Sequence, residues 1–535
     1  MRRPNLLLIQ TDQQKATSLD LYNTDRNFIR TDALRRIAEA GVVCEAGYCP
    51  YPLCVPSRIA MVTGRYPSEL GYVGNRPYPL DCDAPNLFRH LRHNGYRSML
   101  VGKDHAIGLP WDEGGSVAEK WRGNRAIQDS FDWVYATFHG GNMTPDTRAD
   151  QPHIQSFLDQ ADQLQHLWGS AVAPFDGDQS QSARMCEVAV DYLDTWKRDD
   201  AGADTPFAMW LSFPDPHEFY QAPRDVVARV RSDDLGAPHG ADVDLGDRAE
   251  YIQFMRWYFN SGGVPREVID QLVRVYLAMC LNVDEQLRRV LDHLERIGEW
   301  DNTLIVYCSD HGDFNGDLGL VQKFNAGYDG CCRVPFVMAF PGRGPGGLRS
   351  REPVNLADLP ATICDGLGVA ALPGDRGRSL MPIVVGEEHE EAAYTVVESG
   401  VPGESLSTRD IANFADHRWD VQPDGRWCYD PPHRFGGRMY AVRSADHKLI
   451  VREGQCSEFY DLVADPWELR NAIDDPQHAQ LVATHHEYLV EHLCQRAPVP
   501  PGTTIADQDA VYRAGGNLSW AESLALHRGV QGVPV

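Results

Sequence analysis

Short apolar runs alternate along this chain with segments of helical periodicity. The nearly continuous runs predict strands that are buried on both faces; they are NLLLIQTD (5–12), RSMLVGKD (97–104), PFAMWLSFPDP (206–216) and NTLIVYCSDHGD (302–313). TDALRRIAEAG (31–41) predicts a helix ended by its glycine. After Pro265, apolar residues three or four apart from Val268 to Val290 predict a long amphipathic helix. The alternation predicts an α/β domain whose layered, mostly parallel sheet has helices on both faces.

The pattern changes in the last third of the chain. A hairpin is predicted at 439–454, a further strand-like segment at 458–471 and a helix at 476–494. On that helix, the histidines at 485, 486 and 492 stand near two glutamates, which indicates a solvated face. We therefore expect three parts, namely a large domain over 1–385, a smaller α+β C-terminal subdomain with an antiparallel sheet over 386–494, and a tail over 495–535.

Polar residues stand where the predicted strands end. Asp12, Lys103, His217 and Asp310 each lie at or just past the C-terminal end of an apolar run. In open α/β sheets, ligands bind outside the carboxyl ends of the strands. We therefore expect these four side chains, distant in sequence, to meet at one edge of the sheet.

Composition narrows the classes of partner. The 535 residues are 43% hydrophobic and 24% charged, with a formal net charge of -26. This charge argues against a general nucleic-acid or acidic-membrane binder, so an anionic ligand would need a local cationic pocket. Thirteen cysteines without a regular framework indicate reduced thiols. The first apolar run is too short for a secretory signal, and no run has membrane-spanning length, so we expect a cytoplasmic protein.

The segment CVPSRIAMVTG (54–64) contains the first candidate for chemistry. Pro56 suits the first turn of a helix and Gly64 suits its end. Cys54 would then lie at a helix N-terminus, where backbone N–H groups favour an anion. A single cysteine is more often a buried apolar residue, and Arg58, one turn later, would more often form an ordinary ion pair.

Two strand ends offer a set of metal ligands. Asp12 is followed by Gln13, and Asp310 by His311. Two carboxylates, an amide oxygen and an imidazole can close around a divalent cation. Either aspartate alone would more often cap a strand end, but the two together favour a metal. Calcium suits the oxygen ligands, and the histidine also admits manganese or zinc.

Five ordered elements together resemble the formylglycine-dependent sulfatases (type I) of the alkaline-phosphatase-like superfamily. The match is carried by C-V-P-S-R with T-G-R, by GKDH (102–105), by SFPDPH (212–217), by SDHGD (309–313) followed by Lys323, and by YAVRSADHKLIV with EFYDLVADPWELRN. They span residues 4–472 in family order. The resemblance implies an alkaline-phosphatase-like fold and one divalent metal, expected to be Ca²⁺ with Mn²⁺, Mg²⁺ or Zn²⁺ as alternatives. Asp12, Gln13, Cys54, Asp310 and His311 would hold it.

The resemblance also implies roles at the reacting centre. A formylglycine-generating enzyme would oxidise Cys54, and the hydrated aldehyde would attack a sulfate monoester, which splits one hard step into two. Arg58 would hold the hydrated aldehyde, and Lys103 and Lys323 would neutralise sulfate oxygens. His105 would be the base that regenerates the aldehyde, and His217, with Lys323, would protonate the leaving oxygen. Asn75 is a further candidate for contact with substrate.

Two other functions stay open. Phosphonate monoester or phosphodiester hydrolases on the same scaffold resemble this chain in their Asp-Gln and Asp-His elements. They generally lack the Lys and His of G-K-x-H, which this chain keeps as Lys103 and His105. A non-catalytic binding protein would not need every one of these charged groups. The sulfate ester (aryl, sugar or alkyl) and the oligomeric state stay open, although the tail could serve subunit contacts. Residues 400–410 and 423–437 are candidate pocket loops.

Overall fold

An eight-stranded mixed sheet forms the centre of the protein in a computed structural model. The structure describes residues 2–23, 29–75, 80, 84–108, 125–137, 170–200, 204–231, 235–259, 264–400 and 436–495. The strand order is β11-β2-β10-β9-β1-β7-β4-β5, and only β10 runs antiparallel to its neighbours. The strands are β1 (Asn5–Thr11), β2 (Gly41–Cys44), β4 (Arg97–Gly102), β5 (Trp133–Ala136), β7 (Phe207–Ser212), β9 (Thr303–Ser309), β10 (Phe336–Ala339) and β11 (Leu348–Ser350). The predicted layered α/β domain is confirmed.

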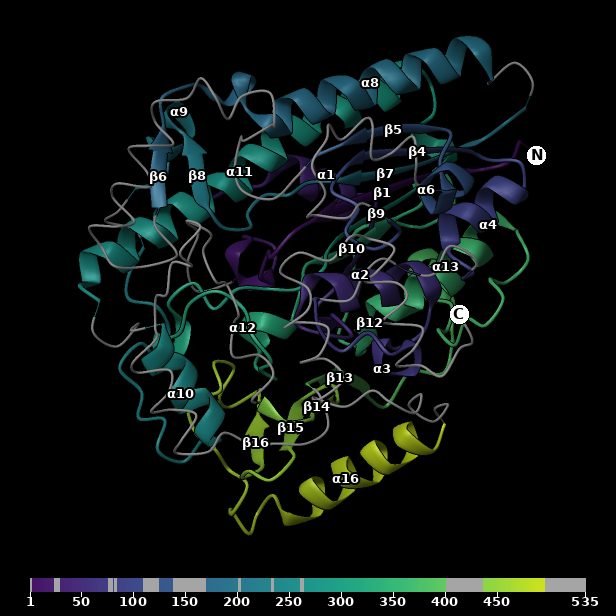
Figure 1. Cartoon of the computed structure of the whole chain (residues 1–535). Helices are drawn as coiled ribbons and strands as arrows, with labels where there is room; N and C mark the ends of the chain where they lie inside the picture. The colour runs from purple at the N-terminus through teal and green to yellow at the C-terminus, as the bar shows by residue number, and fades with distance from the viewer. Residues whose placement is uncertain are drawn as a thin grey trace.

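Helices cover both faces of this sheet. In Figure 1, α8 and α11 lie above the sheet, and α2 and α13 lie below it. The helices of this domain are α1 (Asp32–Glu39), α2 (Cys54–Thr63), α3 (Pro67–Leu70), α4 (Leu87–His93), α6 (Arg125–Ser130), α8 (Gln181–Asp199), α9 (Arg224–Val227), α10 (Glu250–Tyr258), α11 (Arg266–Arg296), α12 (Asp329–Cys332), α13 (Leu359–Leu367) and α14 (Met381–Val385). Two small parallel pairs, β3 (Gly47–Tyr48) with β12 (Val354–Asn355) and β6 (Ser170–Ala173) with β8 (Tyr220–Pro223), complete the domain.

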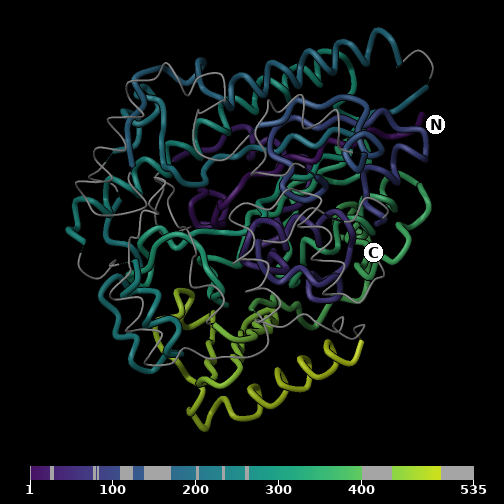
Figure 2. The backbone as a smooth tube through the Cα atoms, viewed as in Figure 1, coloured from purple at the N-terminus to yellow at the C-terminus, as the bar shows by residue number. Residues whose placement is uncertain are grey.

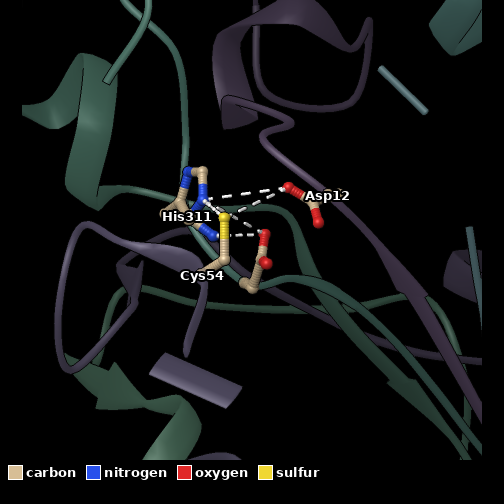
Figure 3. Close-up of side chains that lie close together, drawn as sticks. Asp12, Cys54 and His311 are labelled. Carbon is tan, nitrogen blue, oxygen red and sulfur yellow. Dashed lines mark hydrogen bonds and ion pairs between the residues drawn. The ribbon is translucent and has the colours of Figure 1, made fainter. Parts of the chain in front are cut away.

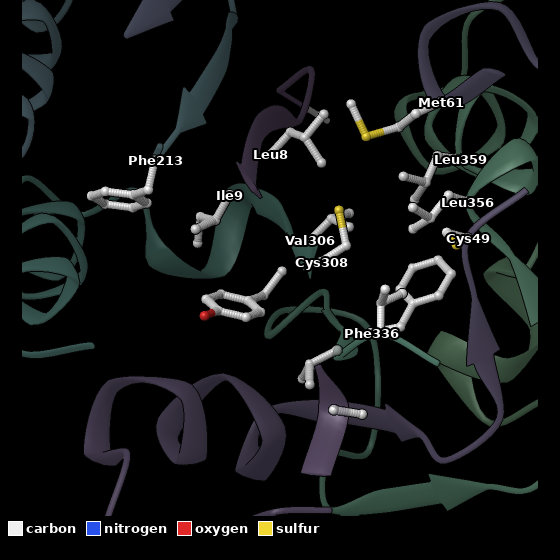
Figure 4. Close-up of a cluster of buried hydrophobic side chains, with 14 of the residues drawn as sticks. Leu8, Ile9, Cys49, Met61, Phe213, Val306, Cys308, Phe336, Leu356 and Leu359 are labelled. Atoms are coloured by element: carbon white, nitrogen blue, oxygen red, sulfur yellow. The ribbon is translucent and has the colours of Figure 1, made fainter. Parts of the chain in front are cut away.

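The core lies on both sides of the first strand. Every residue of β1 is buried, which explains why its apolar residues, Leu6 to Ile9, form a continuous run and do not alternate with polar ones. Figure 4 shows Leu8 near Met61 of α2, while Ile9 lies toward Phe213. Alternate side chains of one strand therefore serve the two helical layers. The purple trace in Figure 2 shows this N-terminal strand inside the molecule.

One glycine has a different role from the predicted one. The sequence assigned Gly41 to the end of the helix at 31–41, but α1 ends at Glu39 and Gly41 is the first residue of β2. A Cβ atom at Gly41 would lie 2.0 Å from the backbone oxygen of Met338 in β10. Close approach of two strands, and not helix capping, explains this glycine.

A smaller antiparallel sheet forms the C-terminal part, as predicted. Its strands are β13 (Thr395–Ser399), β14 (Met439–Arg443), β15 (His447–Arg452) and β16 (Glu458–Asp461), and the hairpin is the β14–β15 pair. Val397 and Ala441 pack into the main core, whereas Val396 and Val442 belong to a separate apolar cluster with Leu489 of α16 (Ala479–Cys494). The sheet therefore joins the large domain by one face and carries α16 on the other.

The expected solvated face of α16 is wrong for two of its histidines. His485 is buried, with its ring nitrogens near the Leu481 carbonyl and the Ser444 hydroxyl. His492 is also buried and packs edge-on against Tyr66. The candidate pocket loops between 401 and 435, and the tail beyond 495, lie outside the described residues. Among the described helices, none combines the length and the apolar character that crossing a membrane requires.

Candidate active site

Ends of parallel strands bring the candidate ligands together at one edge of the main sheet. β1 and β9 are neighbours whose last residues, Thr11 and Ser309, are paired. Asp12 and Asp310 follow directly, so they leave the sheet side by side. Cys54 reaches the same place as the first residue of α2, whose end is marked by Gly64 in the left-handed conformation with φ 68°.

Asp12, Cys54, Asp310 and His311 form one buried cluster. One ligand atom from each lies within 4.8 Å of those of the other three. The Cys54 Sγ is 3.1 Å from the His311 Nε2 and 3.8 Å from an Asp12 oxygen. Figure 3 shows the Cys54 sulfur between the His311 imidazole and the Asp12 carboxylate. Four donors from three chain segments therefore point at one small volume.

The chemistry of these donors fits a divalent cation. The His311 Nδ1 is 3.0 Å from the Gly312 carbonyl, to which its N–H can donate, so Nε2 is the nitrogen that faces the cluster. The carboxylates supply hard oxygen ligands, and an oxygen on position 54 would add another. Burial of two carboxylates is also easier to explain when positive charge lies between them.

Arg58 provides part of that positive charge. Its Nη2 donates to Asp12 at 2.8 Å and its Nε to Asp310 at 2.7 Å, with all three side chains fully buried. Its Nη1 donates to the carbonyls of Lys103 and Asp104 and to the Ser212 hydroxyl. The guanidinium therefore fixes the two carboxylates relative to each other and ties them to the ends of β4 and β7.

Electrostatics favour an anion at position 54. Burial acts to raise the pKa of the Cys54 thiol, but the positive charges of Lys103 and His311 outweigh it and hold this pKa well below its usual range. Burial likewise disfavours the charged form of His311, but Asp310 and Cys54 outweigh it and raise the pKa of the imidazole to about 9. Asn75 lies beside the same helix N-terminus, where it accepts a hydrogen bond from the Val55 N–H at 3.2 Å.

Lys103 and His105 line one side of the cluster. The Lys103 ammonium forms a buried ion pair with Asp12. Burial, reinforced by the charge of Lys103, lowers the pKa of His105 to about 3 and keeps this imidazole neutral. His105 is also hydrogen-bonded to Cys54. A neutral imidazole beside Cys54 can accept a proton.

Gln13 lies next to the cluster but uses its side chain differently. Its backbone N–H donates to Asp310 at 3.0 Å, and its φ of 65° turns the chain sharply there. The amide oxygen accepts a hydrogen bond from Lys323, and the amide nitrogen donates to Asp313 at 2.6 Å. The ligand role of Gln13 therefore stays a prediction, since in this conformation its oxygen faces an ammonium.

His217 and Lys323 form a second buried pair. The Lys323 Nζ is 2.7 Å from the His217 Nε2, and both side chains are buried. We predicted one role for these two residues, protonation of the leaving oxygen, and the structure places them in contact. Each stands within the charge network of the cluster, since Lys323 contributes to lowering the pKa of Cys54.

Three residues of this network, namely Asp313, Tyr220 and Glu218, were not identified from the sequence. Asp313 accepts hydrogen bonds from Gln13 and from the Tyr220 hydroxyl, the latter at 2.6 Å. Glu218 forms an ion pair with Lys323 at 2.9 Å. Glu218 directly follows His217, and Asp313 closes the SDHGD element, so position within a motif was the available signal.

Comparison with known proteins agrees with this geometry. The family described as Sulfatase matches residues 4–369. Choline-sulfatase of Rhizobium meliloti is 26% identical over 481 residues, which cover 89% of this chain and 83% of the relative. N-acetylglucosamine-6-O-sulfatase of Bacteroides thetaiotaomicron is 24% identical over 90% of this chain and 84% of the relative.

A solved structure supports the same fold. The phosphonate monoester hydrolase from Silicibacter pomeroyi superposes with a TM-score of 0.69 at 22% identity, covering 92% of this chain and 96% of the other. The alkaline-phosphatase-like architecture is therefore confirmed.

Proposed function

The chain belongs to the sulfatase family and is a sulfate ester hydrolase, and we propose that it uses formylglycine made from Cys54 as its nucleophile. The observation that carries this proposal is the position of Cys54. Its Sγ lies at the N-terminus of a buried helix, 3.1 Å from His311 and inside the cluster with both aspartates. A structural cysteine would not need this concentration of charge around it.

In this proposal, Asp12, Asp310, His311 and the modified position 54 hold one divalent cation, with Gln13 as a further ligand. Ca²⁺ is the proposed ion because oxygen donors predominate, while Mn²⁺, Mg²⁺ and Zn²⁺ are the alternatives. A cation bound here would act as a Lewis acid on the sulfate group.

The surrounding side chains divide the remaining work. Formylglycine, in its hydrated form, supplies the attacking oxygen and a second hydroxyl. Arg58 orients position 54 through its fixed contacts with both carboxylates, and Lys103 and Lys323 bind sulfate oxygens. His105, neutral because its pKa is low, accepts the proton of the second hydroxyl. His217 and Lys323 together give a proton to the leaving oxygen.

Mass spectrometry of the peptide that contains Cys54 tests the nucleophile. The protein should be purified from its native source or together with a formylglycine-generating enzyme. We expect an aldehyde at position 54 in active protein, and loss of activity in Cys54→Ala. Cys54→Ser should accumulate a sulfate ester and turn over poorly, because release then needs a separate water. Cys456→Ala, at an exposed thiol far along the chain, is the matched control. An intact thiol in fully active protein would refute the proposal.

The substrate class is also part of the proposal, and the names of the relatives suggest it. Their names include choline, an aryl group and an N-acetylglucosamine sulfate, so we propose a sulfate monoester of a small molecule or a saccharide. A panel of sulfated mono- and oligosaccharides beside 4-nitrophenyl sulfate would identify the ester group.

A phosphonate monoester or phosphodiester hydrolase is the second candidate, favoured by the pairs Asp12-Gln13 and Asp310-His311 and by the fold neighbour. Rates on 4-nitrophenyl sulfate and 4-nitrophenyl phenylphosphonate rank the two functions, and a large preference for the phosphonate would replace our choice.

The remaining features belong to the same proposal. We place the domain boundary at residue 385, because α14 ends at Val385 and the first strand of the small sheet begins at Thr395. Maturation by a formylglycine-generating enzyme and a cytoplasmic location are proposed with it. Fractionation of the native cells checks the location.

A further inference from the structure

Glu218 contacts both members of the pair that is proposed to protonate the leaving oxygen. Its carboxylate oxygens lie 2.9 and 3.1 Å from the Lys323 Nζ. Its backbone carbonyl is 2.6 Å from the His217 Nδ1, and one carboxylate oxygen is 3.4 Å from the same nitrogen. One residue therefore holds the ammonium with its side chain and the imidazole with its main chain.

These contacts fix the direction of the His217–Lys323 hydrogen bond. With the Nδ1–H donating to the Glu218 carbonyl, the Nε2 of His217 is the acceptor and Lys323 is the donor. Gln13 provides a further acceptor to the ammonium. These contacts direct the Lys323 N–H groups in the free enzyme, and one N–H is given up to a substrate oxygen in the proposed reaction.

Charge supports the same arrangement. Burial acts to raise the pKa of Glu218, but the positive charge that the His217–Lys323 pair carries outweighs it and lowers this pKa to about 2. Glu218 is thus a carboxylate, with its side chain only 11% exposed. Of the three contacts named above, the one with Glu218 carries a negative charge, whereas those with the imidazole and the amide do not.

We propose that Glu218 is a positioning residue, whose carboxylate holds the Lys323 ammonium against His217 so that the pair faces the leaving oxygen. This inference rests on the proposed function. As the hydroxyl oxygen of position 54 bonds to sulfur, the ester S–O bond breaks and its electron pair passes to the leaving oxygen, which forms an O–H bond with the proton that Lys323 and His217 share. Water later returns one proton to the pair. Glu218 keeps its charge throughout and does not touch the substrate.

Leaving-group dependence separates this role from that of a structural ion pair. Nitrophenolate leaves without a proton because it stabilises its own charge, whereas methoxyphenolate requires one. We compare kcat/KM for 4-nitrophenyl sulfate and 4-methoxyphenyl sulfate in the wild-type enzyme, Glu218→Gln and Glu218→Asp. For Glu218→Gln we expect a loss of about 100-fold on the methoxyphenyl ester and less than about fivefold on the nitrophenyl ester, with KM nearly unchanged.

A positioning role and a packing role of Glu218 also predict different orders of activity for the two variants. Glu218→Asp keeps the charge and should recover most of the activity on the methoxyphenyl ester, whereas a packing role would favour the isosteric glutamine. Glu285→Gln removes a carboxylate from a surface ion pair with Arg229 and serves as the control. Equal losses on both esters, no loss on either, or an aspartate variant no better than the glutamine variant would overturn the inference.

The proposed function can be refuted independently of the role of Glu218. If the wild-type enzyme prefers phosphonate esters of the same two phenols, sulfate hydrolysis is not its main activity. The ratio between the two phenols, measured in the phosphonate series, then decides the role of Glu218 by the same criterion.

Discussion

Arg58 offers the most direct test of how the cluster is held together. Its guanidinium makes five hydrogen bonds, to two carboxylates, two carbonyls and one hydroxyl, and it is fully buried. Arg58→Lys keeps the charge but offers only three N–H groups from a single nitrogen. At least two of the five acceptors therefore lose their donor in a place that water reaches poorly.

The expected cost follows from those lost bonds. Each buried acceptor left without a partner costs about 1–3 kcal/mol, so the loss of two should lower the free energy of unfolding of Arg58→Lys by about 2–6 kcal/mol. Misplacement of the carboxylates by the shorter reach should also lower kcat/KM by about 100-fold. Urea titration followed by tryptophan fluorescence measures the first effect, and hydrolysis of 4-nitrophenyl sulfate measures the second.

Arg36→Lys provides the comparison. Arg36 also bridges two carboxylates, Asp292 and Glu295, each at 2.8 Å, but these side chains are 59% and 68% exposed. Such surface pairs contribute about 0–1 kcal/mol, so this variant should unfold close to the wild-type protein. If Arg58→Lys were as stable as Arg36→Lys, the argument that Arg58 fixes the two aspartates by geometry would be wrong.

Three further predictions concern the metal, one titrating carboxyl group and one glycine. Prolonged chelation should abolish ester hydrolysis and lower the thermal midpoint while far-ultraviolet circular dichroism is unchanged, and Ca²⁺ should restore activity better than Zn²⁺. Burial raises the pKa of Asp284 from 3.8 to about 7, because it outweighs the opposite effect of the hydrogen bonds from the Leu34 and Ala33 N–H groups. The protonated Asp284 carboxyl therefore stabilises the fold fully below pH 3.8, and this stabilisation is lost as the pH rises through 7. Denaturant titrations across this window should show a decline of up to about 4 kcal/mol in the wild-type protein that Asp284→Asn lacks. Gly41→Ala should lower the thermal midpoint markedly, because its Cβ would overlap the Met338 oxygen, whereas Gly298→Ala, where the added atom meets no neighbour within 4 Å, should show only backbone strain from its φ of 72°.

Sequence pattern predicted the fold well because burial in this protein is nearly complete on both sides of the main sheet. Strands such as β1 and β9 carry no solvated face, so their continuous apolar runs end sharply at a polar residue. Those endings gave the positions of Asp12 and Asp310, and parallel pairing explains why the two meet. Gly41 shows the limit, since a glycine after a helical pattern is equally consistent with a helix end and with a tight strand contact.

Side-chain contacts between segments distant in sequence could not be predicted from the pattern in the same way. His485 stands near glutamates in sequence, but its ring meets Ser444 of the β14–β15 turn, which the helical pattern does not reveal. Glu218 and Asp313 were missed for the same reason, since their partners, Lys323 and Gln13, lie about a hundred and three hundred residues away in the sequence. Motifs identify residue types at strand ends, whereas hydrogen-bond networks depend on which loops the fold brings face to face.

The C-terminal sheet holds the segment that carries Cys54, on both sides of α2. Before the helix, the Glu398 N–H donates to the Pro50 carbonyl, and the Gly400 N–H donates to the Tyr51 hydroxyl. After the helix, the Tyr66 hydroxyl donates to the Val396 carbonyl at 3.1 Å.

The carboxylate of Glu398 adds to these contacts by accepting from the Ser68 N–H and hydroxyl at 2.8 and 2.9 Å. A single strand, β13, is thus bonded to the chain at both ends of α2. Since Cys54 is the first residue of that helix, its distance to His311 depends on how β13 is seated. The small sheet is therefore part of the structure that positions Cys54, in addition to packing against the large domain.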